Sequence, residues 1–260
     1  MNIQKTTLLI ICCFFGGTIH PKKQQKLVFS MIMKNEAGRK LRECLEEVRH
    51  YIESNLGALA VIIDDASTDN SVEIAQEILG DKLILIRNTQ SRFSNEIVLR
   101  KQQWEETIKT NPDWILNIDA DQIFETKMRN EIYYLINQDE IDVWCFRLYD
   151  FWDETHYRDD QMWCAHNTYR SFLIRYKKDF NYTWKETPQH CGHFPQSIYF
   201  GGLRIGYSQM RLKHYGWAKE EDRIAKYHRY MKLDPGAKYG NQAHYDSILD
   251  PNPHLLEWVE

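Results

Sequence analysis

Short apolar runs alternate along the first half of the chain with segments in which apolar residues recur every three or four positions. The short runs, which are typical of buried strands, occupy residues 26–33, 58–65, 82–88, 113–119 and 142–152. The segments with helical spacing fall between them, at residues 35–54, 67–79, 95–110 and 127–136. Strands that alternate with helices of this length imply right-handed crossovers and a mostly parallel central sheet flanked by helices. The pattern therefore predicts an α/β fold.

The pattern changes after residue 150. Polar and aromatic residues are mixed there, with one clear strand at residues 171–176 and one helix at residues 219–231. A strand-like run that contains His214 follows the glycine pair Gly201 and Gly202. We expect residues 26–150 to form a regular ligand-binding half of one domain. Residues 151–260 form a divergent half that ends in a helix and a tail rich in turn formers.

Residues 1–25 form an apolar leader before this domain. A short basic start precedes an apolar run from Leu8 to Phe15, which is too short to span a bilayer. The run resembles the hydrophobic region of a signal peptide, although no clear cleavage site follows it. A membrane-touching anchor and a non-native leader are the alternatives, and the folded unit is expected to start near Lys26.

Charge and cysteine usage narrow the functional classes. The formal net charge is −4, whereas general nucleic-acid binders usually carry a basic excess, so no nucleic-acid partner is expected. An anionic ligand would need local basic groups or a metal ion. The six cysteines form no Cys-x-x-Cys pair, which argues against a zinc site or a small disulfide scaffold. Free thiols in a reducing compartment are expected, and the prediction is a cytoplasmic protein, membrane-associated at most weakly through its N-terminal stretch.

Acidic residues follow two of the predicted strands at the point where each strand ends. Asp64 and Asp65 end the second strand, and Asp119 and Asp121 follow the fourth. In open α/β sheets, ligands bind outside the carboxyl ends of the strands. An Asp-x-Asp pair at such an end can bind Mg²⁺ or Mn²⁺, with water and phosphate oxygens filling the other positions. The alternative, capping of the next helix, would account for Asp121 alone but not for both pairs.

Three motifs in this order give the chain a family resemblance. "FSMIMKNE", "VIIDDASTDNS" and "WILNIDADQIF" resemble the opening strand, the acidic turn and the metal motif of glycosyltransferase family 2, which has the GT-A fold. The resemblance covers residues 27–150 and makes residues 26–150 the nucleotide-sugar-binding half and residues 151–260 the acceptor and catalytic half. Ala66 stands where the family usually has Gly, and Gln122 stands where a third Asp often follows.

The resemblance implies a nucleotide pocket at the first two strand ends. Asp65, together with Asp64, is expected to contact the base or ribose of the nucleotide sugar, because a carboxylate accepts well from a uracil N–H or ribose hydroxyls. Asn35 and Glu36 would line the same pocket. Helix capping explains Ser67 but not both of the acids that precede it. A UDP-sugar is the favoured donor.

The resemblance also implies a site for Mn²⁺ or Mg²⁺ and the diphosphate. Asp119 would face the ribose or the metal, and Asp121 would bind the metal that bridges the diphosphate. His214 is the candidate late ligand of the metal or phosphate, since a neutral imidazole coordinates Mn²⁺, and a structural histidine is the alternative. Arg100 and Lys101 would meet the nucleotide or its phosphates, and a solvated helix face is the alternative.

Family 2 resemblance implies inversion at the sugar, which needs a general base to take the acceptor proton. The candidates are Glu186, then Asp159 and Asp160. Glu186 is preferred because Trp184 and His190 flank it with groups that suit a sugar, and a surface glutamate is the alternative. His190 is also a candidate for shaping the donor or acceptor pocket.

Two other functions remain to be weighed. A sugar nucleotidyltransferase normally has a Gly-rich loop near the first strand, where this chain has only Gly38. A non-catalytic protein that binds glycans or nucleotide sugars would not need the intact pair of Asp119 and Asp121. The leading prediction is thus a metal-dependent, inverting glycosyltransferase. Its acceptor class, whether glycan, lipid-linked, protein or small molecule, and its oligomeric state stay open at this point.

Overall fold

The computed structural model describes residues 24–54 and 57–260, and the predicted apolar leader lies almost entirely outside these residues. The helices and strands follow in the order β1 (Leu27–Met33), α1 (Leu41–Glu53), β2 (Leu59–Asp64), α2 (Ser71–Leu79), β3 (Leu83–Arg87), α3 (Glu96–Ile108), β4 (Trp114–Asn117), β5 (Gln122–Phe124), α4 (Met128–Ile136), β6 (Val143–Asp150), β7 (His156–Arg158), β8 (Tyr169–Arg175), β9 (Ile205–His214), α5 (Glu220–Leu233), α6 (Gln242–Asp246) and β10 (Leu255–Glu257).

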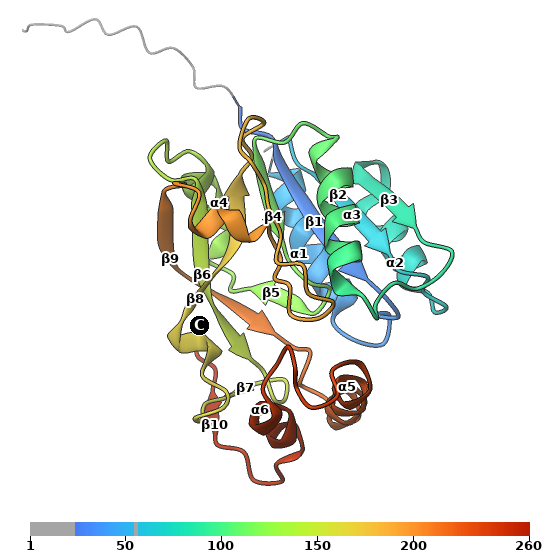
Figure 1. The fold of residues 1–260 in the computed structure, drawn as a ribbon. Coiled ribbons are helices and arrows are strands. Elements are labelled where there is room, and N and C mark those ends of the chain that lie inside the picture. The colour runs from blue at the N-terminus through green and yellow to red at the C-terminus, as the bar shows by residue number, and fades with distance from the viewer. Residues whose placement is uncertain (1–23, 55–56) are drawn as a thin grey trace, which may run out of the picture.

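One large sheet runs through the molecule in the order β3-β2-β1-β4-β8-β6-β9-β5 (Figure 1). Strands β3, β2, β1 and β4 pair in parallel, as the alternation of strands and helices predicts. Strand β8 then runs antiparallel to both β4 and β6, and β9 runs parallel to β6 and antiparallel to β5. The predicted α/β fold is confirmed, with a parallel first half and a mixed second half.

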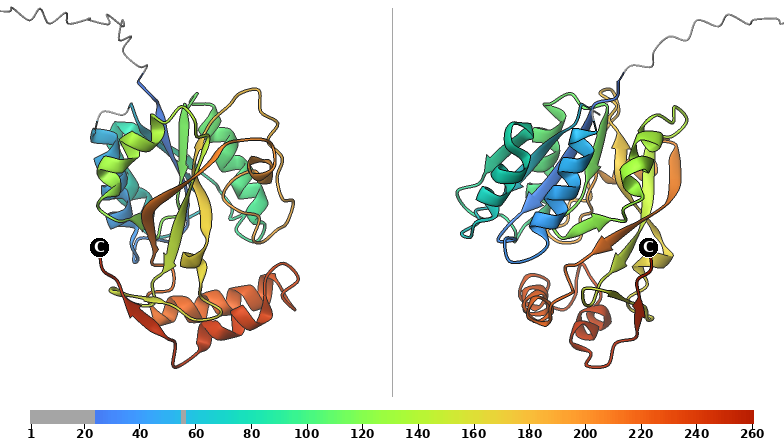
Figure 2. Two further views of the ribbon diagram at one scale, coloured as in Figure 1. Left: turned by 90° about the vertical axis from the view of Figure 1, so that its left-hand side faces the viewer. Right: turned by 180° about the vertical axis from the view of Figure 1, so that it is seen from behind.

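Helices cover both faces of the parallel half, which explains why β1 is buried along its whole length. Phe29 and Met31 belong to the main core, together with the buried residues of α1 and α2. Ile32 points to the opposite face, where it clusters with Leu99 of α3. Figure 2 shows α3 on the opposite side of the sheet from α1 and α2.

Some boundaries differ from the sequence prediction. Helix α1 begins at Leu41 and not near residue 35, because the preceding segment is bonded to the loop before α2. The backbone N–H of Glu36 donates to Ser71 Oγ (2.8 Å), and that of Ala37 donates to Asp69 Oδ2 (3.1 Å). Strand β9 was expected only as a strand-like run, because its sequence mixes polar with apolar residues, and β5 was not predicted.

The segment after β9 folds together with β7 into what we call the C-terminal cap: α5, α6 and the small antiparallel sheet of β7 and β10. Its core is a cluster of Trp152, Trp163, Trp217 and Ile248. The buried Arg158 guanidinium lies over the Trp152 ring, 4.6 Å from its centroid. Figure 1 shows α5 facing the carboxyl ends of the parallel strands. The cap therefore closes one side of the region where ligands bind in such sheets.

Two findings bear on the surroundings of the protein. Within the described residues, Cys44, Cys145, Cys164 and Cys191 are all free thiols. No helix in this part of the chain is both long and apolar enough to cross a membrane. The cytoplasmic location stays a prediction.

Candidate active site

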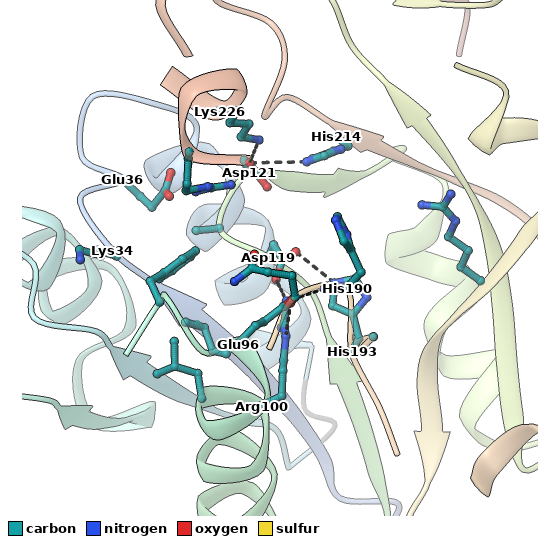
Figure 3. Close-up of a pocket in the computed structure, with 18 of the residues that line it drawn as sticks. Lys34, Glu36, Glu96, Arg100, Asp119, Asp121, His190, His193, His214 and Lys226 are labelled. Carbon is teal, nitrogen blue, oxygen red and sulfur yellow. Dashed lines mark hydrogen bonds and ion pairs between the residues drawn. The ribbon is translucent and has the colours of Figure 1, made fainter. Parts of the chain in front are cut away.

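A cavity of about 450 Å³ opens at the carboxyl ends of the strands. Its walls come from the loop after β1, the start of α3, the turn between β4 and β5, residues 189–193, the end of β9 and α5 (Figure 3). Of the site residues predicted from the sequence, this cavity brings together Glu36, Arg100, Asp119, Asp121 and His214. The Asp-x-Asp pair thus faces a hollow large enough for part of a nucleotide sugar.

Asp119, the first acid of the pair, is held by neighbouring side chains. Arg100 Nη2 donates to its Oδ1 at 3.0 Å, and His193 Nε2 lies 3.0 Å from its Oδ2. Burial acts to raise the pKa of Asp119, but the charges of Arg100 and His193 hold it well below its usual range. The carboxylate of Asp119 is therefore ionised and fixed in place.

Asp121, the second acid, is less completely satisfied. Its Oδ1 is buried without a hydrogen-bond partner in the described part of the chain. Its Oδ2 lies 3.6 Å from His214 Nε2 and 3.7 Å from Lys226 Nζ. Burial acts to raise the pKa of Asp121, but His214 and Lys226 lower it below its usual range. An ionised carboxylate in the cavity wall thus keeps one buried oxygen without a hydrogen-bond partner.

His214 is oriented by a second carboxylate. Asp150, at the end of β6, places its Oδ1 2.7 Å from His214 Nδ1, so that Nε2 faces Asp121. The two acids outweigh the effect of burial and raise the pKa of His214 to about 9. A carboxylate on the outer nitrogen is the arrangement that orients a metal-ligating histidine.

The residues around Asp121 fit a divalent cation. Mg²⁺ and Mn²⁺ sites that also bind phosphates need only one or two protein ligands, and water and phosphate oxygens complete the shell. The Asp121 carboxylate, with its unpartnered Oδ1, provides one such ligand. His214 Nε2 would provide a second one once metal binding displaces its proton, because the pKa of His214 is raised to about 9 in the metal-free site. The described residues contain no ready cluster of three acidic, histidine or cysteine ligands. Asp119 stays a predicted ligand, although both of its oxygens already have partners.

The acids after β2 lie beside the cavity and organise its loops. Asp65 accepts from Ser91 Oγ (2.6 Å) and from the backbone N–H of Arg92 (2.9 Å), which fixes the loop after β3. Asp64 accepts from the Ser67 N–H at 3.2 Å. Asn35, with φ 53°, accepts from the Thr68 N–H at 2.8 Å and ties the loop after β1 to the loop after β2. The side chains of Asp64, Asp65 and Asn35 do not line the cavity. Their contacts to a nucleotide stay predictions.

Glu36 reaches the cavity from the loop after β1. It accepts hydrogen bonds from Arg39 Nη1 at 3.1 and 3.2 Å. Burial, reinforced by the nearby Asp121, raises the pKa of Glu36 to about 7. Its position agrees with the predicted place in the pocket wall, and its contact with a nucleotide stays a prediction.

The predicted general bases lie outside the lining of this cavity. The exposed Glu186 pairs with Lys101, with its Oε1 2.5 Å from Lys101 Nζ. Asp160 pairs with Arg158, and Asp159 Oδ1 lies 3.0 Å from His166 Nε2. The structure therefore does not gather these acids around Asp121, and their catalytic role stays a prediction.

The structure adds residues from the divergent half that the sequence prediction missed. His193 reaches Asp119 because the loop is tied at both ends: Asn117 Nδ2 donates to the His193 carbonyl (2.9 Å), and Glu96 Oε2 accepts from the His190 N–H (3.0 Å). Gly192, with φ 87°, allows the turn between the two histidines. Lys226 arrives from the C-terminal cap. Neither His193 nor Lys226 lies in one of the three motifs, and no local pattern marks either of them as a site residue.

The cavity carries more cations than carboxylates. Among the described residues, six basic side chains line it: Lys34, Arg39, Arg100, Arg170, Lys226 and Arg229. The carboxylates are those of Glu36, Glu96, Asp119 and Asp121. The excess contrasts with the net charge of −4 of the whole chain. The cavity thus provides the local basic groups that an anionic ligand needs.

Comparison with known proteins places these features in context. The family model described as "Glycosyl transferase family 2" matches residues 29–199. An uncharacterized protein of Mycobacterium tuberculosis is 26% identical over 237 residues, which cover 85% of this chain and 54% of that protein. An uncharacterized glycosyltransferase of Rickettsia bellii is 33% identical over 118 residues, 44% of this chain and 35% of that protein. The chain spans about half the length, or less, of these curated relatives.

Among solved structures, TarS of S. aureus is similar. Its crystal structure matches with a TM-score of 0.52 and 16% identity, over 86% of this chain and 42% of that chain. The crystal structure of TarS in complex with UDP-GlcNAc matches with a TM-score of 0.50 and 16% identity, over 86% of this chain and 70% of that chain. At these identities the likeness concerns the fold.

Proposed function

The chain belongs to glycosyl transferase family 2, and from this premise we propose that it transfers a sugar from a nucleotide-diphosphate donor to an acceptor hydroxyl. The GT-A fold expected for this family is the fold of the chain. The observation that carries the proposal is the Asp121 carboxylate in the turn between β4 and β5, which lines a cavity rich in cations and has one unpartnered oxygen. Such a site suits a diphosphate bound through a metal ion.

A UDP-sugar is the proposed donor. TarS, which has the same fold, binds UDP-GlcNAc, and this supports the choice of base. We assign Asn35, Glu36, Asp64 and Asp65 to the nucleoside side, where the loops after β1, β2 and β3 meet. Arg100 fixes Asp119, and we also assign Lys101, the next residue of α3, to the phosphates, although its ammonium pairs with Glu186 in this structure.

Asp121 and His214, with Asp119, would hold Mn²⁺ or Mg²⁺ in this proposal. When bound, the ion would neutralise charge that develops on the departing diphosphate. The chain's own residues prepare that position. Asp150 directs His214 Nε2 toward Asp121, and the Arg100 guanidinium keeps Asp119 ionised and in place. Preorganised charges of this kind act without reorganising during the reaction.

Inversion requires a base for the acceptor hydroxyl, and we propose Glu186 ahead of Asp159 and Asp160. Glu186 stands on the segment whose later residues, 189–193, line the cavity. The ion pair with Lys101 connects it to α3, next to Arg100. Asp159 and Asp160 are engaged by residues of the region around the C-terminal cap.

A donor screen tests the proposed function. UDP-, GDP- and dTDP-sugars are added with Mn²⁺ to wild type and to Asp121→Asn, and thermal unfolding and release of free nucleotide are measured. A matching donor at 100 times its Kd should stabilise the wild type by roughly 2.7 kcal/mol, which raises Tm by several degrees. Asp121→Asn should lose most of the metal-dependent shift and of the turnover. Binding without any transfer or hydrolysis would favour a non-catalytic protein, and no binding of any donor would refute the proposal.

A further inference from the structure

Helix α5 buries a lysine. Among the described residues of this 14-residue helix, Lys226 is the buried one, with 9% of its surface exposed, while its neighbours are partly or fully exposed. Lysine is almost never buried unless it is paired. Figure 3 shows Lys226 reaching from the helix toward Asp121. The one buried side chain that the helix places in the cavity wall is therefore a cation, and the partly exposed Arg229 and Tyr230 of the same helix line the cavity beside it.

Lys226 lacks a close bonding partner there. Its Nζ lies 3.7 Å from Asp121 Oδ2, beyond hydrogen-bond distance, and no hydrogen bond to Lys226 forms among the described residues. The Trp217 ring lies below it, with 4.3 Å between Nζ and the ring centroid. Burial lowers the pKa of Lys226, and Asp121 opposes that shift. An ammonium group that is desolvated without a hydrogen bond is a strong binding group for an anion.

Gly216 makes room for this arrangement. A Cβ atom at position 216 would overlap Lys226 Nζ, Asp121 Oδ2 and His214 Nε2 at the same time. The missing side chain thus creates the point at which the lysine, the carboxylate and the imidazole converge. On the other side of Asp121, the Oδ1 atom has no partner. A cation and a carboxylate, each incompletely satisfied, stand side by side in one cavity.

We propose that Lys226 is a fixed cation for the diphosphate of the donor: its ammonium binds a diphosphate oxygen directly and competes with the divalent cation for the Asp121 carboxylate. This inference rests on the proposed function and deepens it. In this proposal a residue of the chain neutralises part of the charge of the diphosphate, so that a diphosphate binds measurably without metal. It also makes the C-terminal cap a part of the donor site, because α5 supplies the group.

Calorimetric titration tests the inference with UDP and with inorganic pyrophosphate, in EDTA. Wild type should bind both. Lys226→Met and the polar Lys226→Gln should weaken both by about 10- to 100-fold, the usual loss for a hydrogen bond from a charged group. Lys232→Met is the matched control, because it removes the same charge from an exposed position of the same helix and should change affinity less than twofold. Unfolding curves confirm that each variant is folded.

The proposed competition between Lys226 and the divalent cation for the Asp121 carboxylate can be measured separately. Mn²⁺ binding to the nucleotide-free protein, followed by the electron spin resonance of free Mn²⁺, should become several-fold tighter in Lys226→Met, because a neighbouring positive charge is removed. Unchanged UDP and pyrophosphate affinities in EDTA for both Lys226 variants would overturn the inference, as would wild-type binding that requires Mn²⁺. Pyrophosphate binding that depends on Lys226, without transfer from any nucleotide sugar, would instead contradict the proposed function alone.

Discussion

The side-chain amide of Gln122 forms hydrogen bonds with both the backbone N–H and the carboxylate of Asp119, the first acid of the Asp-x-Asp pair. Its Oε1 accepts from the Asp119 N–H at 2.9 Å, and its Nε2 donates to Asp119 Oδ2 at 3.4 Å. A third aspartate, which is common here in related sequences, could accept from the N–H but could not donate to the carboxylate. Cys44 supports the same turn from α1, with its Sγ 3.2 Å from the Gln122 carbonyl. The amide therefore adds a donor without adding negative charge beside the metal position.

Ala66 provides a prediction about stability. It replaces the usual glycine and has φ 60°, in the left-handed region that costs a residue with a Cβ roughly 1–2 kcal/mol. Glycine also gains more conformational entropy than alanine on unfolding. This offsets roughly 0.4–1 kcal/mol of the stabilisation that comes from removing the strain. Ala66→Gly should therefore stabilise the protein by about 0.5–1 kcal/mol, measured by urea unfolding. Ala75→Gly, inside α2, is the control and should destabilise it. A loss of stability in both variants would show that Ala66 is not strained.

Glu186 provides a prediction about catalysis. If it is the general base, Glu186→Gln should lower turnover by about 10²- to 10⁴-fold, the usual contribution of such a group, and leave UDP affinity unchanged. Glu105→Gln, at an exposed position of α3, is the control and should keep wild-type turnover. Steady-state transfer assays and UDP titration separate the two effects. Wild-type turnover in Glu186→Gln would show that Glu186 is not the general base and that it only forms a surface ion pair with Lys101.

Single residues of the candidate site were predictable only where a motif or the family resemblance pointed to them. Asp119 and Asp121 follow an apolar strand, and the parallel sheet requires that strand to end at the ligand-binding edge. His193 and Lys226 reach the same cavity through a loop and a helix whose positions depend on distant contacts, such as Asn117 to the His193 carbonyl. No local pattern encodes those contacts.

Among the elements, β6, β8 and β9 are joined at one end by a buried carboxylate. Asp142 precedes β6 and accepts from Arg204 Nε (3.1 Å), just before β9, and it lies 2.9 Å from Lys177 Nζ, just after β8. These strands differ in how well the sequence predicts them. Strand β6 is mostly apolar and almost wholly buried, whereas β9 alternates lysine, arginine and glutamine with apolar residues and is only partly buried. Its place in the sheet is set by pairing with β6 and β5 rather than by its own composition.

The ion pairs of Asp142 with Arg204 and Lys177 predict that the stability of the protein depends on pH. Burial acts to raise the pKa of Asp142, but Arg204 and Lys177 lower it to about 2, below the value of about 3.9 for an unfolded aspartate. A lowered pKa stabilises the native state above the unfolded value, and this contribution is lost as the pH falls from about 4 toward 2. Asp142→Asn should therefore be less stable at pH 6, with a smaller deficit at pH 3.

Urea unfolding at several pH values measures that difference. Asp81→Asn is the control, because Asp81 is an exposed residue whose carboxylate is 3.6 Å from Lys82. It should show the wild-type pH dependence. A deficit in Asp142→Asn that is equally large at pH 3 and pH 6 would contradict the assigned pKa.

At the scale of the whole molecule, the cavity is completed by a segment far away in the sequence. The cap's tryptophan cluster joins positions from Trp152 to Ile248, and its helix α5 contributes Lys226, Arg229 and Tyr230 to the cavity lining. The helix was predicted close to its observed bounds, but its orientation was not. Its buried residue is a lysine, and Tyr227 and Tyr230, which pack against the tryptophan cluster, are only partly buried, so the hydrophobic pattern gives a weak signal for the face that packs.

The attachment of α5 to the first half of the chain predicts a coupling between the cap and donor binding. Arg39, in the loop after β1, donates to Asp222 Oδ1 at 2.7 Å through Nη2, and Lys219 Nζ donates to the Gly38 carbonyl at 2.7 Å. Asp222→Asn removes the charge that holds Arg39 against α5. If Lys226 must be held in place to bind the diphosphate, UDP affinity in EDTA should fall by about 3- to 10-fold, although Lys226 itself is unchanged.

Glu221→Gln is the matched control, because it removes an exposed charge from the same turn of α5 and should leave UDP affinity unchanged. Hydrogen exchange supplies the second measurement, since looser attachment should raise exchange in α5 while the central strands β1 and β4 stay protected. Weaker binding with unchanged exchange would assign Asp222 a purely electrostatic effect on the cavity. Unchanged binding with faster exchange would show that the cap can move without displacing Lys226, and it would separate the stability of the cap from the donor site.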